Sequence, residues 1–154
     1  MVISEILPFH ACKRCAACCK GKVIPLYSPD FRRLSGLEGF SVHTSKLERA
    51  LTGAHYKMRM AGSRCVFLQG GLCSHYELRP DTCRRHPFIV TENWILVNPA
   101  CPGIDWNRKN IEGEEHYRKL SSGISDWIDA LVGSAGGITS PQTRRVVPRK
   151  RGAP

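Results

Sequence analysis

The segment CKRCAACC holds four of the chain's eight cysteines within eight positions. They are Cys12, Cys15, Cys18 and Cys19. Two thiolates three positions apart on a tight turn can converge on one metal, while the backbone N–H groups between them point at the sulfurs. A disulfide framework, a nucleophile and a metal site are the three explanations that compete for such a segment. The other cysteines and the composition of the chain help to choose among them.

Four more cysteines follow at wider spacing, and they are Cys65, Cys73, Cys83 and Cys101. Eight thiolates are enough for two four-ligand sites, either two iron–sulfur clusters or two zinc ions, or for one such site with four thiols left over. Neighbouring cysteines diverge in most backbone conformations, so we expect Cys18 and Cys19 to serve different centres or different corners of one. All eight are candidate metal ligands.

The eight cysteines differ in how strongly the sequence indicates that they bind metal. Pro102 follows Cys101, as a proline ends the bacterial ferredoxin run, so we group Cys101 with the first three cysteines of CKRCAACC. Cys65 lies in the apolar stretch CVFL, where a plain core cysteine is the competing interpretation. No histidine marks a cysteine as a nucleophile, so no catalytic residue is assigned.

The composition is that of one globular domain with a basic tail. The 154 residues include 23 Lys and Arg and 13 Asp and Glu, a formal net charge of +10. Five of the basic residues lie in the last eleven positions, which leaves 18 basic and 13 acidic residues, or +5, for the remainder. We predict one domain over residues 1–137 and a disordered basic tail over 138–154, which could contact nucleic acid through phosphates.

The sequence favours the cytoplasm. The N-terminal apolar run contains Glu5 and lacks the basic segment that opens a secretory signal, and no apolar stretch approaches the roughly 20 residues that span a bilayer. We therefore expect no membrane association. Because cytoplasmic thiols are kept reduced, eight cysteines indicate metal binding before disulfides.

The elements that position the thiols are predicted to be short. Pro25 suits an edge strand, and Ser28, Pro29 and Asp30 are typical of a helix start. Ser45 has capping-box spacing for a second short helix. Residues 56–97 read as small hairpins with turns and single helical turns between them, and an apolar stripe predicts an amphipathic helix over about 110–133. The fold class is a small metal-stabilised α+β domain with irregular cysteine-bearing loops.

Three segments together resemble the cysteine-cluster family named for its CxxCxxCC motif, also called YkgJ-type. They are CKRCAACC, CVFLQGGLCSHYELRPDTCRRHPF and CPGID. After the first motif, the matching positions are Cys65, Phe67, Leu68, Cys73, Tyr76, Arg79, Pro80, Cys83, Arg84, Pro87 and Cys101. The resemblance covers about residues 9–105 and departs at Ala16, where Gly is usual. It implies a zinc- or iron-chelating domain or an iron–sulfur-cluster-containing protein.

We therefore expect a metal-binding protein that carries one or two 4Fe–4S clusters, or zinc, and that has a redox or cluster-dependent role with a redox or protein partner. The family link also implies an alternative, a transferase similar to protein-lysine N-methylases. The net charge and the tail leave a third hypothesis, a zinc-stabilised nucleic-acid-binding module. In each case metal would replace part of the hydrophobic core, so chelation should destabilise the fold.

Overall fold

The computed structural model describes residues 1–47, 54–134 and 145–146. Within them lie the α-helices α1 (Ser28–Leu34), α2 (Asp81–Arg84), α3 (Glu114–Ser121) and α4 (Ser125–Gly133), and the 3-10 helices η1 (Ala17–Cys19), η2 (Phe40–His43) and η3 (Tyr76–Leu78). The strands are β1 (Val2–Ser4), β2 (Pro8–His10), β3 (Pro25–Leu26), β4 (Thr44–Lys46), β5 (Tyr56–Met58), β6 (Met60–Ala61), β7 (Arg64–Cys65), β8 (Leu68–Gln69), β9 (Leu72–Cys73), β10 (Phe88–Val90), β11 (Ile95–Val97), β12 (Ile104–Lys109) and β13 (Arg145–Val146). This mixture of short helices and small sheets confirms the α+β class.

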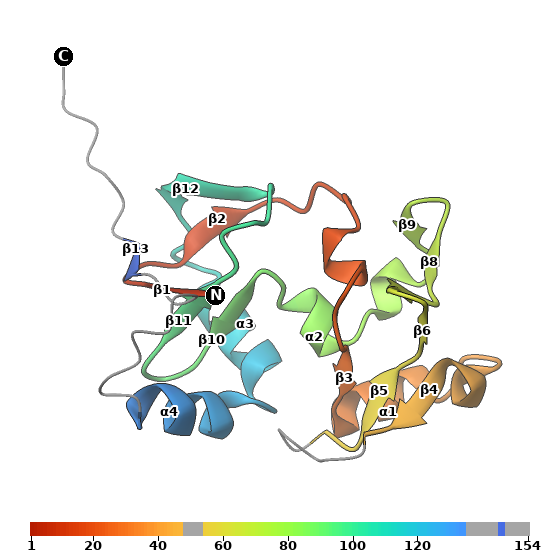
Figure 1. Cartoon of the computed structure of the whole chain (residues 1–154). Coiled ribbons are helices and arrows are strands. Elements are labelled where there is room, and N and C mark those ends of the chain that lie inside the picture. The colour runs from red at the N-terminus through yellow and green to blue at the C-terminus, as the bar shows by residue number, and fades with distance from the viewer. Residues whose placement is uncertain (48–53, 135–144, 147–154) are drawn as a thin grey trace.

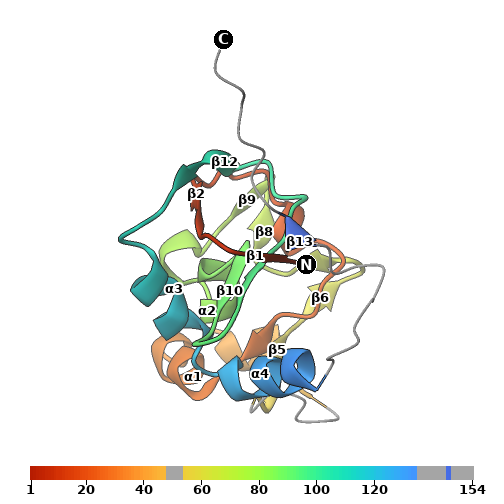
Figure 2. The ribbon, with the colours of Figure 1, turned by 90° about the vertical axis from the view of Figure 1, so that its left-hand side faces the viewer.

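The elements divide into two halves, with α2 and the cysteine-rich segment between them (Figure 1). The sheet half contains a four-stranded sheet of order β10-β11-β1-β13, the β2–β12 pair, α3 and α4. In it β1 is antiparallel to β11 and parallel to β13, and Figure 2 shows β1 beside β13. The side chains of Phe88, Val90 and Val97 are almost completely buried in its core. The backbone N–H of Val90 donates to Ser121 Oγ at 3.1 Å, which ties α3 to the sheet.

The hairpin half contains α1, the three-stranded sheet β3-β5-β4 and the hairpins β6–β7 and β8–β9. Its core includes Leu26, Leu34, Met58 and Phe67. Pro25 lies in an edge strand, as predicted, because Pro has no N–H to donate to a second neighbour. The predicted hairpins are also present. A third group of buried side chains, which includes Tyr27 and Ile128, joins the two halves beneath the cavity described below.

Two predicted helices differ from the structure. The single helix expected over 110–133 is wrong, because α3 and α4 are separate and Gly123 lies between them. A Cβ at Gly123 would collide with the ring of Tyr27, so the absence of a side chain lets the break close onto the core. The helix expected at Ser45 begins instead as strand β4, which pairs with β5. The rest of that prediction, residues 48–53, lies outside the described residues.

Part of the predicted tail can be placed. Only Arg145 and Val146 of residues 138–154 are described, and they form β13 beside β1. The disordered tail therefore stays a prediction. The remainder of the tail lies outside the described residues. None of the helices in the described part of the chain has the length and apolar character needed to cross a bilayer.

Candidate metal centre

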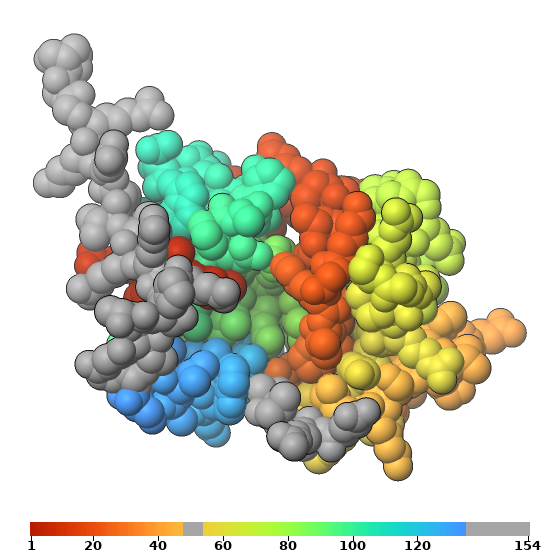
Figure 3. Space-filling model, viewed as in Figure 1, coloured from red at the N-terminus to blue at the C-terminus, as the bar shows by residue number. Residues whose placement is uncertain are grey.

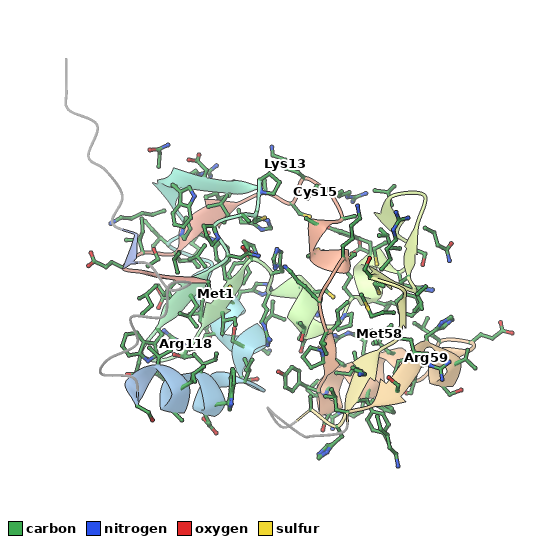
Figure 4. The ribbon with its side chains drawn as sticks, viewed as in Figure 1. Met1, Lys13, Cys15, Met58, Arg59 and Arg118 are labelled. Carbon is green, nitrogen blue, oxygen red and sulfur yellow. The ribbon has the colours of Figure 1, made fainter. Side chains whose placement is uncertain are left out.

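A cavity of about 500 Å³ lies between the sheet half and the hairpin half, and most of the cysteines surround it. Seven of the eight line it: Cys12, Cys15, Cys18, Cys19, Cys73, Cys83 and Cys101. Cys65 does not line the cavity and is buried in the neighbouring core. Figure 3 shows the cysteine-rich segment as a surface ridge between β12 and the hairpins. In Figure 4 Lys13 and Cys15 lie on the loop at the top of this ridge.

Two left-handed residues shape the CKRCAACC segment. Arg14 has φ 52° and Ala16 has φ 58°. Residues other than Gly adopt this left-handed backbone region at a cost in free energy. The turn at Arg14 lets its N–H donate to Cys12 Sγ at 3.4 Å. The turn at Ala16 starts η1, in which the N–H of Cys19 donates to the Ala16 carbonyl at 3.0 Å. The family's usual Gly at this position is therefore explained by the backbone.

The sheet half positions Cys12, Cys15 and Cys101, which we call the rim thiols. The strands β2 and β12 pair with Ile104 opposite His10, and the N–H of Ala11 donates to the Gly103 carbonyl at 3.0 Å. A Cβ at Gly103 would collide with the Ala11 carbonyl oxygen, so glycine permits this close approach. His10 Nε2 lies 3.6 Å from Cys101 Sγ. Cys12 and Cys15 are exposed on the loop that follows, whereas Cys101 is half-buried.

The hairpin half positions Cys19, Cys65, Cys73 and Cys83, which we call the core-side thiols. Cys65 is a buried member of the hairpin-half core, and the other three pack against that core. The N–H of Gly21 donates to the Ser63 carbonyl at 2.7 Å, which fixes the end of the cysteine-rich segment to the β6–β7 hairpin. Cys73 and Cys83 lie in β9 and α2, so the prediction that these two thiols sit on loops is wrong, whereas Cys65 lies in β7, within a predicted hairpin. Very short elements hold them instead.

A buried carboxylate fixes the helix that carries Cys83. Asp30, completely buried in α1, accepts hydrogen bonds from the N–H of Asp81 at 2.7 Å and from Arg33 at 2.7 Å. Its other oxygen accepts from the N–H of Tyr27 at 2.9 Å, which caps α1. Thr82 Oγ1 also donates to the Pro25 carbonyl at 3.1 Å. These bonds hold α2 against β3 and α1 without any metal.

The pKa shifts reflect how closely the thiols are gathered. Burial raises the pKa of the Cys83 thiol, and the nearby Cys18 and Cys65 raise it further. Burial likewise raises the pKa of Cys101, with Cys15 and Cys12 adding to the rise. A hydrogen bond from the Cys19 thiol lowers the pKa of Cys18 and raises that of Cys19, so this pair shares one proton.

Cys18 lies at the junction of the two groups, because it affects the pKa of core-side Cys83 as well as that of rim thiol Cys101. After the hydrogen bond from Cys19, the positive charges of Lys22 and Arg79 help to lower the pKa of Cys18. Cys19 packs against the hairpin-half core. Its thiol nevertheless hydrogen-bonds that of Cys18, so these adjacent side chains do not diverge, and their division between different centres stays a prediction.

The donor set fits a thiophilic metal, although no coordination shell is closed. Among residues 1–47, 54–134 and 145–146, no three His, Cys, Asp or Glu side chains are arranged to hold a metal ion. Thiolate sulfur is the ligand that zinc and iron–sulfur clusters take most often. The thiols surround one cavity, so rotation between staggered χ1 positions would be needed to draw them onto a metal. All eight cysteines are free thiols and available for this.

The positioning roles of two residues, His10 and Asp30, are not evident from the sequence. His10, two positions before Cys12, is placed against Cys101 by strand pairing across 91 positions. Asp30 was read only as a helix-start residue, yet it bonds to Asp81, 51 positions away. Arg79, one of the positions that carry the family resemblance, donates through Nε to the Tyr76 carbonyl at 2.6 Å. The sequence carried no signal for the long-range contacts of His10 and Asp30.

The comparisons with known proteins give one match. The model of a family named CxxCxxCC, described as "Putative zinc- or iron-chelating domain", matches residues 11–102. These residues include all eight cysteines. No curated protein and no solved structure matches the chain.

Proposed function

Because the chain belongs to the CxxCxxCC family of zinc- or iron-chelating domains, we propose that its eight cysteines hold metal as thiolates, most fittingly as 4Fe–4S clusters and otherwise as zinc. The proposed ligands are Cys12, Cys15, Cys18, Cys19, Cys65, Cys73, Cys83 and Cys101. The observation that carries the proposal is the gathering of seven thiols, from segments far apart in the sequence, around one cavity. Four such thiols brought together without metal would otherwise be prone to oxidation.

The surroundings of the thiols favour two metal centres. The core-side thiols Cys19, Cys65, Cys73 and Cys83 would form one centre, and the rim thiols Cys12, Cys15 and Cys101 would form the other with Cys18. Apart from Cys18, which raises the pKa of both Cys83 and Cys101, the mutual effects on pKa follow this division: Cys101 responds to Cys15 and Cys12, and Cys83 responds to Cys65 and Cys73. Adjacent Cys18 and Cys19 would then link the centres.

The protein's own residues prepare the thiols for metal. Lys22 and Arg79 favour the thiolate of Cys18, and the N–H of Arg14 donates to Cys12 Sγ, which lowers the charge density on that sulfur. Bound iron–sulfur clusters supply one-electron transfer, whereas zinc supplies a structural crosslink. Exposure of Cys12 and Cys15 would give a redox partner access to the rim centre. We take the site of action to be the cytoplasm, where the thiols would stay reduced.

Elemental analysis tests the proposal. The full chain is purified under anaerobic conditions, and iron, acid-labile sulfide and zinc are measured per chain together with the visible absorption spectrum. We expect about four iron and four sulfide per bound cluster. A colourless protein with stoichiometric zinc and no sulfide would overturn the iron–sulfur assignment and keep thiolate metal binding. Protein that takes up neither metal after anaerobic reconstitution would overturn both.

A further inference from the structure

Two arginines meet over one aromatic ring at the edge of the cavity. The guanidinium carbon of Arg79 lies 3.5 Å from the centroid of the Tyr76 ring, and that of Arg14 lies 4.5 Å from the same centroid. All three residues line the cavity. Two positive charges therefore contact the same ring at the edge of the cavity, and an anion bound there would be stabilised by them.

The Arg79 guanidinium is held in a fixed position. Its Nε donates to the Tyr76 carbonyl at 2.6 Å, and its own carbonyl accepts from Arg33 at 3.0 Å. Stacking on Tyr76 fixes the plane of the group. Among the described residues no hydrogen bond is found for its two terminal amino groups. A planar guanidinium fixed in this way presents parallel N–H donors that match the two oxygens of a carboxylate or a phosphate.

In the described part of the chain no carboxylate forms an ion pair with Arg14 or Arg79. The cavity lining in the described residues includes Lys13, Lys22 and Arg84 in addition to the two stacked arginines, and it includes no Asp or Glu. Of these five, only Arg84 has a carboxylate partner among the described residues, Asp81 at 3.7 Å. Arg79 lies near enough to Cys18 and Cys83 to favour their thiolates. The terminal amino groups of Arg79 have no hydrogen bond within the described residues, so these donors stay available to an anion.

The cavity also has the volume of a small-molecule site. Its volume of about 500 Å³ falls within the range of roughly 300–1,000 Å³ that small-molecule sites occupy. Apolar surface from Leu72 and Pro102 lies in the same cavity as the cationic groups. A cavity of this size and mixed character fits a small organic anion.

We propose that Arg14 and Arg79, stacked on Tyr76, form a binding site for the carboxylate or phosphate group of a small anionic molecule held in the cavity beside the thiols. The site contains no metal ligand, so anion binding and metal content can be measured separately, although Arg79 also favours the thiolate of Cys18. Only the use of the bound molecule, as a substrate or ligand of a metal centre, rests on the proposed function.

Calorimetric titration of the anaerobically purified full chain with citrate and, separately, with inorganic phosphate tests this site. All titrations are made at one ionic strength, because salt screens such contacts. We expect saturable binding of at least one of the two anions. Each of Arg79→Gln and Arg14→Gln should weaken it about tenfold or more, as expected for loss of a charge-assisted bidentate contact.

Arg108→Gln is the matched control. Arg108 also stacks on an aromatic ring, with its guanidinium carbon 3.8 Å from the Phe9 centroid, but it does not line the cavity. It should leave affinity unchanged within about twofold. If Arg79→Gln fails to fold, the exposed Arg14 still provides the test.

Three results would overturn the anion site. They are no saturable binding of either anion, equal weakening by Arg108→Gln, and binding of polyglutamate without binding of the small anions, which would indicate a docking surface for an acidic protein. Metal content is measured on the same samples, so the two proposals fail separately. Protein with full metal and no anion binding contradicts only the anion site, whereas anion binding without metal contradicts only the metal centres.

Discussion

The core-side thiols and the rim thiols have the same chemistry in two different surroundings. Cys65 and Cys83 lie in regular elements and pack in the hairpin-half core, where buried Asp30 fixes the helix of Cys83. Cys12 and Cys15 are exposed on a loop with two left-handed turns. The difference indicates that the core-side group is positioned by the fold, whereas the rim group would take its final geometry from the proposed metal.

This comparison assigns different roles to the two proposed centres. A centre embedded in the core would act mainly as a structural crosslink, because losing it leaves buried thiols without their bonding partner. A centre on an exposed loop can exchange metal or electrons with a partner at less cost to the fold. The predictions below address this difference, beginning with the largest expected effect.

Complete removal of metal should show the difference between the core-side and rim thiols most clearly. Structural thiolate sites contribute on the order of 10 kcal/mol to folded small domains, and 1 kcal/mol shifts the Tm of a domain of this size by about 2–4 °C. We expect chelation under reducing conditions to lower the Tm by about 20 °C or more, with rim metal leaving first. Scanning calorimetry with metal analysis at each step measures both. An unchanged Tm after full removal would contradict the structural role.

Single ligand substitutions sharpen the comparison. Cys83→Ser should destabilise the protein by about 3–5 kcal/mol, because it opens the core-side centre and leaves a hydroxyl in a buried position. Cys15→Ser is the matched variant in the rim group and should cost about 1 kcal/mol or less, because strand pairing between β2 and β12 still holds that region. Urea unfolding gives both values. Equal losses would mean that the two groups do not differ.

The buried carboxylate tests whether the fold positions the core-side group. Asp30→Asn replaces one of two accepting oxygens with a donor, so one of the N–H groups of Tyr27 and Asp81 loses its acceptor and the pair with Arg33 weakens. Burial raises the pKa of Asp30, which shows that its charge carries a desolvation cost, so we expect a loss of only about 2 kcal/mol.

Asp126→Asn, in the first turn of α4 and exposed, is the control for Asp30→Asn and should cost under about 1 kcal/mol. Both are measured by urea unfolding. In Asp30→Asn we also expect core-side metal to dissociate faster while rim metal is unaffected. If Asp30→Asn is as stable as the wild type, Asp30 does not position Cys83.

The smallest expected effect is a gain in stability on the rim side. Ala16 has φ 58°, so Ala16→Gly should relieve backbone strain and stabilise the protein by about 0.5–1 kcal/mol. Ala17→Gly, one position later in η1, should instead destabilise the protein by a similar amount. Glycine at this position would increase only the conformational freedom of the unfolded chain. Destabilisation by Ala16→Gly would show that the left-handed turn is not strained.

Local signals made much of the fold predictable from the sequence. Pro25 marked an edge strand, and Asp30 marked the start of α1, although the cap is Tyr27 and not Ser28. The break in the C-terminal helix was not predictable, because a single glycine is compatible with a helical pattern and only packing against Tyr27 gives Gly123 its role. The spacing of the cysteines identified the thiols, but not their division between a core and a rim, which depends on contacts distant in sequence.

The metal content of a rim variant tests the central claim most directly. The triple variant Cys12→Ser, Cys15→Ser and Cys101→Ser removes the rim thiols and leaves the core-side thiols and Cys18 in place. Native mass spectrometry of anaerobically reconstituted protein should find two metal centres in the wild type and one in the variant, which stays folded. One centre in both proteins, or loss of all metal from the folded variant, would contradict two separately held centres.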